Sequence, residues 1–99
     1  MAFIQLIEFR PGDNLAEMQK IMDEWEKATE GKRTAQRSYL TQDRNDPGKY
    51  IQVVIFPSYE EAMKNSQMPE TTEFAGRMMS LAEGPATFHD LDVVDERLG

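Results

Sequence analysis

The chain has 99 residues, no cysteine and a formal net charge of −7 at pH 7. This length fits a single domain, residues 1–99, with a modest hydrophobic core. The missing cysteines exclude disulfides, cysteine metal sites and cysteine nucleophiles, and the acidic balance argues against nucleic acid as a partner. Because no apolar run approaches the length of a membrane span, we expect no membrane partner and a cytoplasmic location.

The first segment, AFIQLIEF at 2–9, predicts a strand that ends at the turn sequence RPGD. Because side chains alternate along a strand, this strand has two faces, and both are mostly apolar: Phe3, Gln5, Ile7 and Phe9 form one, and Ile4, Leu6 and Glu8 form the other. We therefore expect this strand to be covered on both sides.

A helix is predicted next, with a cap at Asp13 or Asn14, the latter paired with Glu17, and a stop at Gly31. Its apolar side chains recur at spacings of three and four, which is typical of a helix packed on one face: Leu15, Met18, Ile21, Met22, Trp25 and Ala28.

The middle of the chain predicts a hairpin. The polar segment 32–43 reads as an edge strand, RNDPGK at 44–49 as a turn, and YIQVVIF at 50–56 as a central strand that is apolar on both faces. The segment 31–49 is also the one basic part of an acidic chain, with five basic and two acidic side chains.

Two short helices and a strand complete the pattern. Ser58 and Glu61 form a capping box, and Pro69 suits the first turn of a second helix. Gly76 inside that helix suggests the close approach of another backbone. The segment 86–94, ATFHDLDVV, predicts the last strand.

The predicted order is β-α-β-β-α-β, which is the ferredoxin-like α+β arrangement with an antiparallel sheet. Its strand order, 4-1-3-2, places the two doubly apolar strands at the centre. Since helices cover only one face of such a sheet, the other apolar face should meet a second copy of the chain. We expect a homodimer in which two sheets pack into a dimeric α+β barrel.

The chain resembles the antibiotic-biosynthesis-monooxygenase-type dimeric α+β barrel superfamily, particularly its small actinobacterial-type members. The resemblance is carried by FIQLIEF, by MDEWEKATEGKR with Trp25, by YIQVVIFPSYEEAMKNSQMPETTEFAGRM and by GPATFHDLDVVDE. It implies a monooxygenase-like protein, since relatives include cofactor-free oxygenases of aromatic polyketides, haem-degrading enzymes and isomerases. Residues 58–82 lack the histidine of the haem-degrading pattern, so we expect neither haem nor another cofactor, and no metal.

The candidate site combines apolar walls with few polar groups. Trp25, Met22, Phe74 and Met78 are expected to line a ligand pocket, because aromatic rings stack on aromatic ligands and methionine fills irregular space. Each of these four also suits ordinary core packing.

The candidate catalytic residues are His89, Tyr39 and Arg37. His89 is the only histidine and suits acid–base chemistry near neutral pH, while Arg37, with Arg33 and Tyr39 on the same strand face, suits binding of an oxyanion. On a strand, His89 and Asp90 point to opposite sides, so they form no orienting pair. An interfacial or solvent-facing position is the alternative for all three.

Two functions follow from the sequence. One is a cofactor-independent oxygenase or related enzyme that acts on a small aromatic or polyketide-like molecule. The other is a non-enzymatic small-molecule-binding or stress-associated dimer. A pocket without converging polar groups would favour the second.

Overall fold

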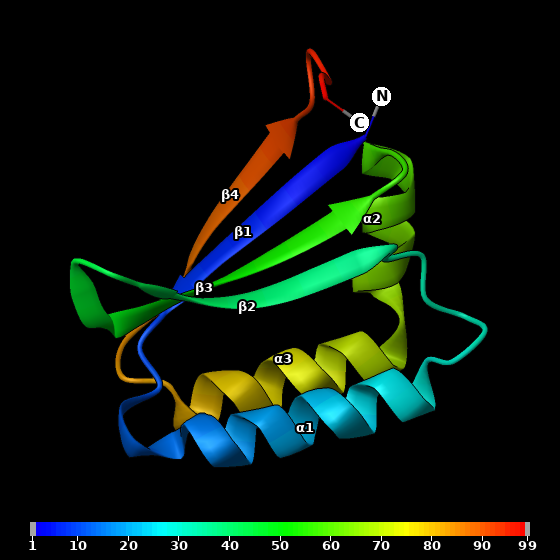
Figure 1. Ribbon diagram of the computed structural model, residues 1–99. Coiled ribbons are helices and arrows are strands. Elements are labelled where there is room, and N and C mark those ends of the chain that lie inside the picture. Colours follow the sequence, from blue (N-terminus) through cyan, green and yellow to red (C-terminus); the bar gives the residue numbers. More distant parts are fainter. Residues whose placement is uncertain (1, 99) are drawn as a thin grey trace.

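The computed structural model describes residues 2–98 (Figure 1). The elements in chain order are β1 (Phe3–Phe9), the short 3₁₀ helix η1 (Gly12–Asn14), α1 (Leu15–Ala28), β2 (Arg37–Asp43), β3 (Asp46–Phe56), α2 (Tyr59–Gln67), α3 (Pro69–Leu81) and β4 (Thr87–Asp92). The four strands form one antiparallel sheet in the order β2-β3-β1-β4. This confirms the ferredoxin-like α+β arrangement.

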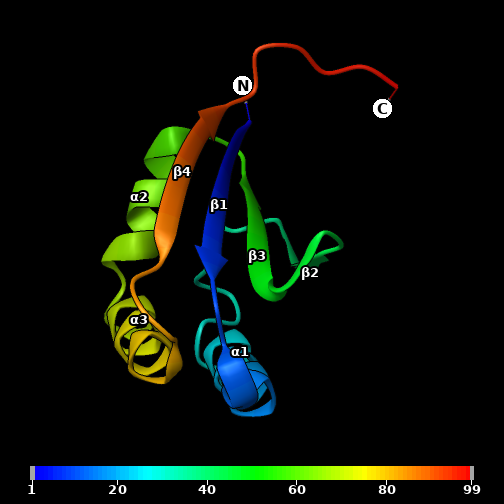
Figure 2. The same ribbon diagram turned by 90° about the vertical axis from the view of Figure 1, so that its left-hand side faces the viewer.

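The three α-helices cover one face of the sheet and leave the other open (Figures 1 and 2). The strand register decides which side chains lie on each face, because directly paired residues point the same way. The covered face carries Phe3, Gln5, Ile7, Phe9, Ser38, Leu40, Tyr50, Gln52, Val54, Phe56, Phe88 and Asp90. The open face carries Ile4, Leu6, Glu8, Arg37, Tyr39, Thr41, Ile51, Val53, Ile55, Thr87, His89 and Leu91.

The best-packed part of the core lies at one end of the covered face. Phe3 and Phe56, paired across β1 and β3, are 2% and 3% exposed and pack against Ala62 of α2. Tyr59 adds an edge-on contact to Phe3, with ring centroids 5.5 Å apart. Met18 of α1 is fully buried. This end of the sheet therefore anchors α2, while α1 and α3 lie side by side further along.

The capping residue Ser58 and the position of Pro69 at the start of a helix are confirmed, and Asn14 lies at the predicted N-cap position of α1 but without the capping-box hydrogen bond. Ser58 Oγ accepts a hydrogen bond from the Glu61 backbone N–H at 3.2 Å, and Pro69 is the first residue of α3. The Asn14 side chain does not cap α1. Its amide instead donates to the Leu81 carbonyl at 3.0 Å, which joins the start of α1 to the end of α3.

The second strand begins at Arg37, five residues later than the expected 32–43 segment. Contacts to α2 engage Thr34 instead of the sheet: the Thr34 backbone N–H donates to Asn65 Oδ1 at 3.1 Å, and the Thr34 hydroxyl donates to the Glu61 carbonyl at 2.5 Å. Arg33 therefore does not share a strand face with Arg37 and Tyr39, as the sequence suggested.

The hairpin turn is shorter than the expected 44–49 segment, since β3 already begins at Asp46. The Asn45 backbone N–H donates to Asp43 Oδ1 at 2.8 Å, so an aspartate side chain closes the turn. Pro47 lies inside β3 because the register with β2 shifts between Gln42 and Asp43, and such irregularities tolerate a residue without an N–H.

Candidate functional site

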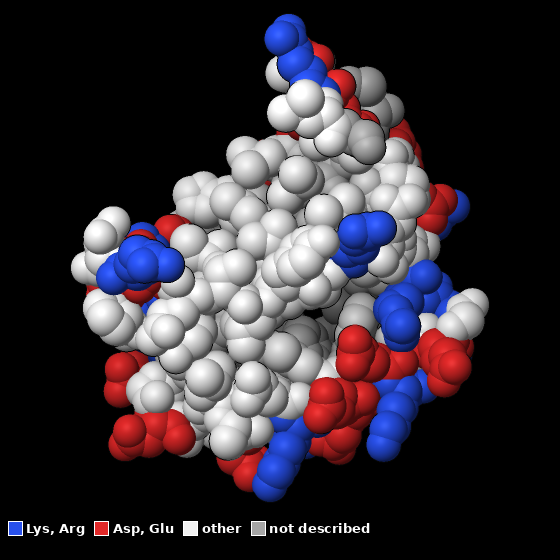
Figure 3. Space-filling view, viewed as in Figure 1, with Lys and Arg blue, Asp and Glu red and all other residues white. Residues whose placement is uncertain are grey.

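A cavity of about 540 Å³ lies between the covered face of the sheet and helix α1. Residues from β1, β2 and β3 line its roof, and residues from α1, α2 and α3 line its floor and wall. Figure 3 shows a hollow between the sheet and the acidic surface below it. The volume lies in the range of small-molecule sites. We call this space the main cavity.

Two aromatic rings form one wall of the main cavity. Trp25 of α1 and Phe74 of α3 pack with ring centroids 5.7 Å apart and ring planes at 42°. The Trp25 indole N–H donates to Thr71 Oγ1 at 3.0 Å, and the Arg33 guanidinium lies 5.9 Å from the Trp25 ring centroid. These contacts hold the indole in place, which favours stacking on a flat ligand.

Two glutamines of the central strands project toward the helices. The Gln5 amide donates to Asp90 Oδ1 at 3.1 Å, and the Gln52 amide donates to Ser38 Oγ. Gln52 Oε1 is buried, and within residues 2–98 it accepts no hydrogen bond. A buried acceptor without a donor carries a cost of about 1–3 kcal/mol. Gln52 therefore carries an unpaired acceptor at a position that lines the cavity.

The charge at the main cavity is negative. Asp23 and Glu26 of α1 are exposed carboxylates that line it. In the part of the chain that the structure describes, no lysine or arginine is among its lining residues. A neutral or cationic molecule is thus better suited to this cavity than an anion.

A second, smaller cavity of about 140 Å³ continues beneath β1 and β4. Gln52 is the only residue in its lining with a polar side chain among those described; the others are Ile7, Phe9, Met18, Met22, Phe74, Ala75, Met78, Met79, Ala82, Gly84, Pro85, Ala86 and Phe88. It shares Ile7, Met22, Gln52 and Phe74 with the main cavity. We call this space the inner chamber.

The structure brings together the residues predicted to line a ligand pocket. Trp25, Met22 and Phe74 line the main cavity, and Met22, Phe74 and Met78 line the inner chamber. The spacing along α1 and α3 explains this, because residues three or four apart share a helix face.

The three candidate catalytic residues lie elsewhere. Arg37 and Tyr39 of β2 and His89 of β4 belong to the open face, on the side of the sheet opposite the two cavities. An acid–base role in the pocket requires contact with a molecule bound there, and the sheet separates the two. Strand alternation predicted a shared face for Arg37 and Tyr39 and a face of its own strand for His89, but it did not identify which face the helices cover.

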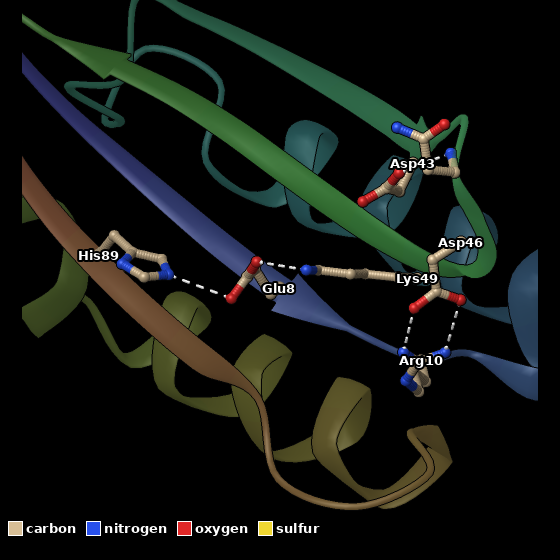
Figure 4. A network of polar contacts seen from close by, with 7 residues as sticks. Glu8, Arg10, Asp43, Asp46, Lys49 and His89 are labelled. Atoms are coloured by element: carbon tan, nitrogen blue, oxygen red, sulfur yellow. Dashed lines mark hydrogen bonds and ion pairs between the residues drawn. The ribbon is translucent and has the colours of Figure 1, made fainter.

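His89 instead belongs to an ionic cluster on the open face with Glu8 and Lys49 (Figure 4). His89 Nε2 lies 3.1 Å from Glu8 Oε2, and Lys49 Nζ lies 3.0 Å from Glu8 Oε1. These two partners hold the pKa of the Glu8 carboxyl below its usual value of 4.5, with the His89 hydrogen bond as the larger cause. Glu8 in turn raises the pKa of Lys49.

Gln52 was not among the residues predicted from the sequence, although a signal for it was present. FIQLIEF and YIQVVIF each carry one glutamine in an otherwise apolar stretch. A polar residue in a doubly apolar strand must face either a partner or a cavity. Gln52 has a partner on one side, because its amide nitrogen bonds to Ser38, while its oxygen, which lies in a residue that lines the cavity, has no partner among residues 2–98.

Neither a metal site nor a membrane span is seen in the described part of the chain. Residues 2–98 hold no group of three or more histidine, aspartate or glutamate side chains placed to bind a metal ion. None of the helices there combines the length and the apolar character needed to cross a membrane.

No family model and no curated protein matches this sequence. Solved structures do. The protein Rv0793 from Mycobacterium tuberculosis has a TM-score of 0.79 and 14% identity, covering 98% of this chain and 99% of that one. SnoaB from Streptomyces nogalater, a cofactor-independent oxygenase, has a TM-score of 0.76 and 11% identity, with 99% and 98% covered.

A third similar structure is a Caulobacter crescentus protein whose name places it among the antibiotic biosynthesis monooxygenases. Its TM-score is 0.80 at 14% identity, covering 95% of this chain and 91% of that one. The chain therefore has the fold of the antibiotic-biosynthesis-monooxygenase-type proteins, as its resemblance to that superfamily implied.

Proposed function

We propose that this protein is a homodimer that binds a small aromatic or polyketide-like molecule in the main cavity and oxidises it as a cofactor-independent oxygenase. One observation carries the proposal: a cavity of about 540 Å³ combines an aromatic wall with a buried acceptor, Gln52 Oε1, that has no partner in the described chain. The likeness in fold to SnoaB, which is named as such an oxygenase, supports the reaction class.

The reaction in this proposal needs a substrate that supplies its own electrons. A methylene group activated by a neighbouring phenol loses a proton, and the delocalised anion passes electrons to O₂ and forms a C–O bond. The resulting hydroperoxide loses water and leaves a carbonyl group. The sum, CH₂ + O₂ → C=O + H₂O, balances without an external reductant.

Each lining residue has a distinct role in the proposal. Trp25 and Phe74 stack against the ring, and Met22 adapts its shape to the substrate. Asp23 and Glu26 are the carboxylates at the cavity and can accept the proton. His89, Tyr39 and Arg37 take no part in this step, because the sheet separates them from the cavity. We assign these three to the dimer face.

The homodimer is proposed from the composition of the open face. Figure 3 shows a broad uncharged surface over the sheet, and its aliphatic side chains come from the central strands: Ile4, Leu6, Ile51, Val53 and Ile55. Tyr39 and Leu91 extend the surface on the two edge strands and are 48% and 43% exposed. Apolar surfaces of this kind are typical of interfaces between protein subunits. Packing two open faces would form the barrel.

The experiment that tests the oxygenase uses the single tryptophan as a reporter. A hydroxylated anthrone is titrated into the purified protein under nitrogen, and Trp25 fluorescence is followed. Air is then admitted and O₂ uptake is measured with an electrode. We expect quenching that saturates, then uptake of one O₂ per carbonyl formed. Uptake no faster than in buffer alone would contradict the oxygenase.

The second candidate is non-enzymatic binding, and the charge of the cavity favours it. Among the described lining residues there are two carboxylates and no cation to stabilise a developing anion. Saturable quenching without O₂ uptake would support this binding function. A variant with Trp25→Phe provides the control, because it should lose the optical signal while calorimetry still detects heat of binding.

A further inference from the structure

We propose that the inner chamber binds an unbranched alkyl chain of the ligand, so that the protein selects hydroxylated aromatics that carry such a chain. This inference rests on the proposed binding of an aromatic molecule in the main cavity. It adds a second binding site and a narrower chemical class.

The two spaces meet at a common boundary. Ile7 and Gln52 from the sheet, with Met22 and Phe74 from the helices, line both of them. A ring held beside Trp25 therefore lies next to the entrance of the inner chamber. A substituent on that ring can enter the chamber past two of these side chains, Met22 and Phe74.

The inner chamber suits a chain better than a second ring. Its volume of about 140 Å³ is roughly that of four or five water-sized groups, which a short row of methylenes would fill. Four methionines line it, and their flexible side chains adapt to a chain of varying shape: Met18, Met22, Met78 and Met79. Met79 is 63% exposed, so the far end of the chamber reaches the surface beside α3.

Gln52 determines where the hydroxyl lies. Its Oε1 is buried at the boundary between the two spaces and has no donor within residues 2–98. A hydroxyl on the ring, close to the point where the chain is attached, would satisfy it. A trapped water molecule is the alternative donor, and a methylated hydroxyl distinguishes the two because an ether cannot donate.

The test is titration calorimetry with 5-alkylresorcinols whose chains run from methyl to heptyl. Each buried methylene should lower the Kd about fourfold. The decrease in Kd per added carbon should end near four or five carbons, where the chain reaches the surface. Methylating the hydroxyls should raise the Kd by roughly tenfold, and Gln52→Met should remove that difference.

Two variants of the chamber sharpen the result. Met78→Trp fills it and should abolish the dependence of the Kd on chain length. Tyr59→Trp is the matched control, because it adds the same ring on α2 outside the lining of both spaces. Met78→Ala enlarges the chamber, so the Kd should continue to decrease up to longer chains than in the wild type. This variant provides the test if the tryptophan variant does not fold.

The outcomes separate this inference from the proposed function. If orcinol, the methyl compound, binds and chain length has no effect on the Kd, the inner chamber is not a chain site, while aromatic binding stands. If chain length matters equally in Met78→Trp, the chain lies elsewhere and the inference is again overturned. If none of the compounds binds, both proposals fail.

Discussion

The cluster of Glu8, His89 and Lys49 shows how a single carboxylate can be stabilised on an otherwise apolar surface. Glu8 sits between a histidine on β4 and a lysine on β3, at distances of 3.1 and 3.0 Å. Both partners favour its ionised form, which is why the Glu8 pKa is lowered. The cluster ties β4 and β3 to β1 through side chains in addition to the backbone ladder.

The lowered pKa makes a prediction about stability and pH. A carboxyl whose folded pKa lies below its unfolded value contributes stability above pH 4.5, and this contribution is lost as pH falls through the folded pKa. Glu8→Gln should therefore lower the urea midpoint at pH 7 and lower it by less at pH 3. Urea unfolding at both pH values measures this. Glu96→Gln, in the C-terminal tail, serves as control and should change neither midpoint.

At the scale of elements, α3 contains a glycine whose presence packing does not explain. The sequence suggested a close approach of another backbone to Gly76, and this expectation is wrong. Gly76 is exposed, and a Cβ added to it would meet no atom within 4 Å among the described residues. The residue therefore only weakens the helix, since glycine costs about 1 kcal/mol relative to alanine.

Gly76→Ala should accordingly stabilise the protein by about 0.5–1 kcal/mol. Gly84→Ala is a matched comparison, because a Cβ there also meets no described atom within 4 Å, yet Gly84 has a φ of +79°. That backbone disfavours a side chain, so we expect destabilisation of about 1–2 kcal/mol. Thermal and urea unfolding of both variants measure the difference, and equal shifts in the same direction would contradict it.

The sequence predicted the elements far better than their edges. The apolar runs of β1 and β3, the capping residue Ser58 and the first-turn residue Pro69 are local signals, which do not depend on contacts with distant parts of the chain. The start of β2 depends on Thr34 bonding to α2, a contact between distant segments that no local pattern carries.

For the candidate site, the sequence predicted the walls but not the polar group. Helical spacing placed Met22 with Trp25, and Phe74 with Met78, on shared faces. Strand alternation predicts which residues of one strand share a face with His89 or with Tyr39. It does not predict which side of the sheet the helices cover. The face that the helices cover depends on how each helix connects its two strands, which is a property of the whole fold.

At the scale of the whole molecule, the open face should decide assembly. Val53 lies on β3 near the middle of this face, opposite Leu6 and Tyr39 on the neighbouring strands. We expect the wild type to scatter light with twice the chain mass at micromolar concentration. Val53→Lys should shift it to the monomer, because an unpaired charge buried in an interface costs several kcal/mol.

Thr72→Lys is the control for that change. It adds the same charge at an exposed position on α3, away from the open face, and should leave the dimer intact. A wild type that stays monomeric at micromolar concentration would exclude the barrel. Dissociation by both variants alike would point to net charge as the cause.

The pairing of the first strand with the last has a consequence for how the chain acquires its structure during synthesis. β1 lies between β3 and β4, and Phe3 pairs with Asp92, so its second edge is closed only after a strand far along the chain has been synthesised. Contacts so distant in sequence form slowly. Until they form, the apolar strand FIQLIEF presents an unpaired edge to other nascent chains. The time until β4 has been synthesised and has paired with β1 thus sets how long the β1 edge of each new molecule is exposed to aggregation.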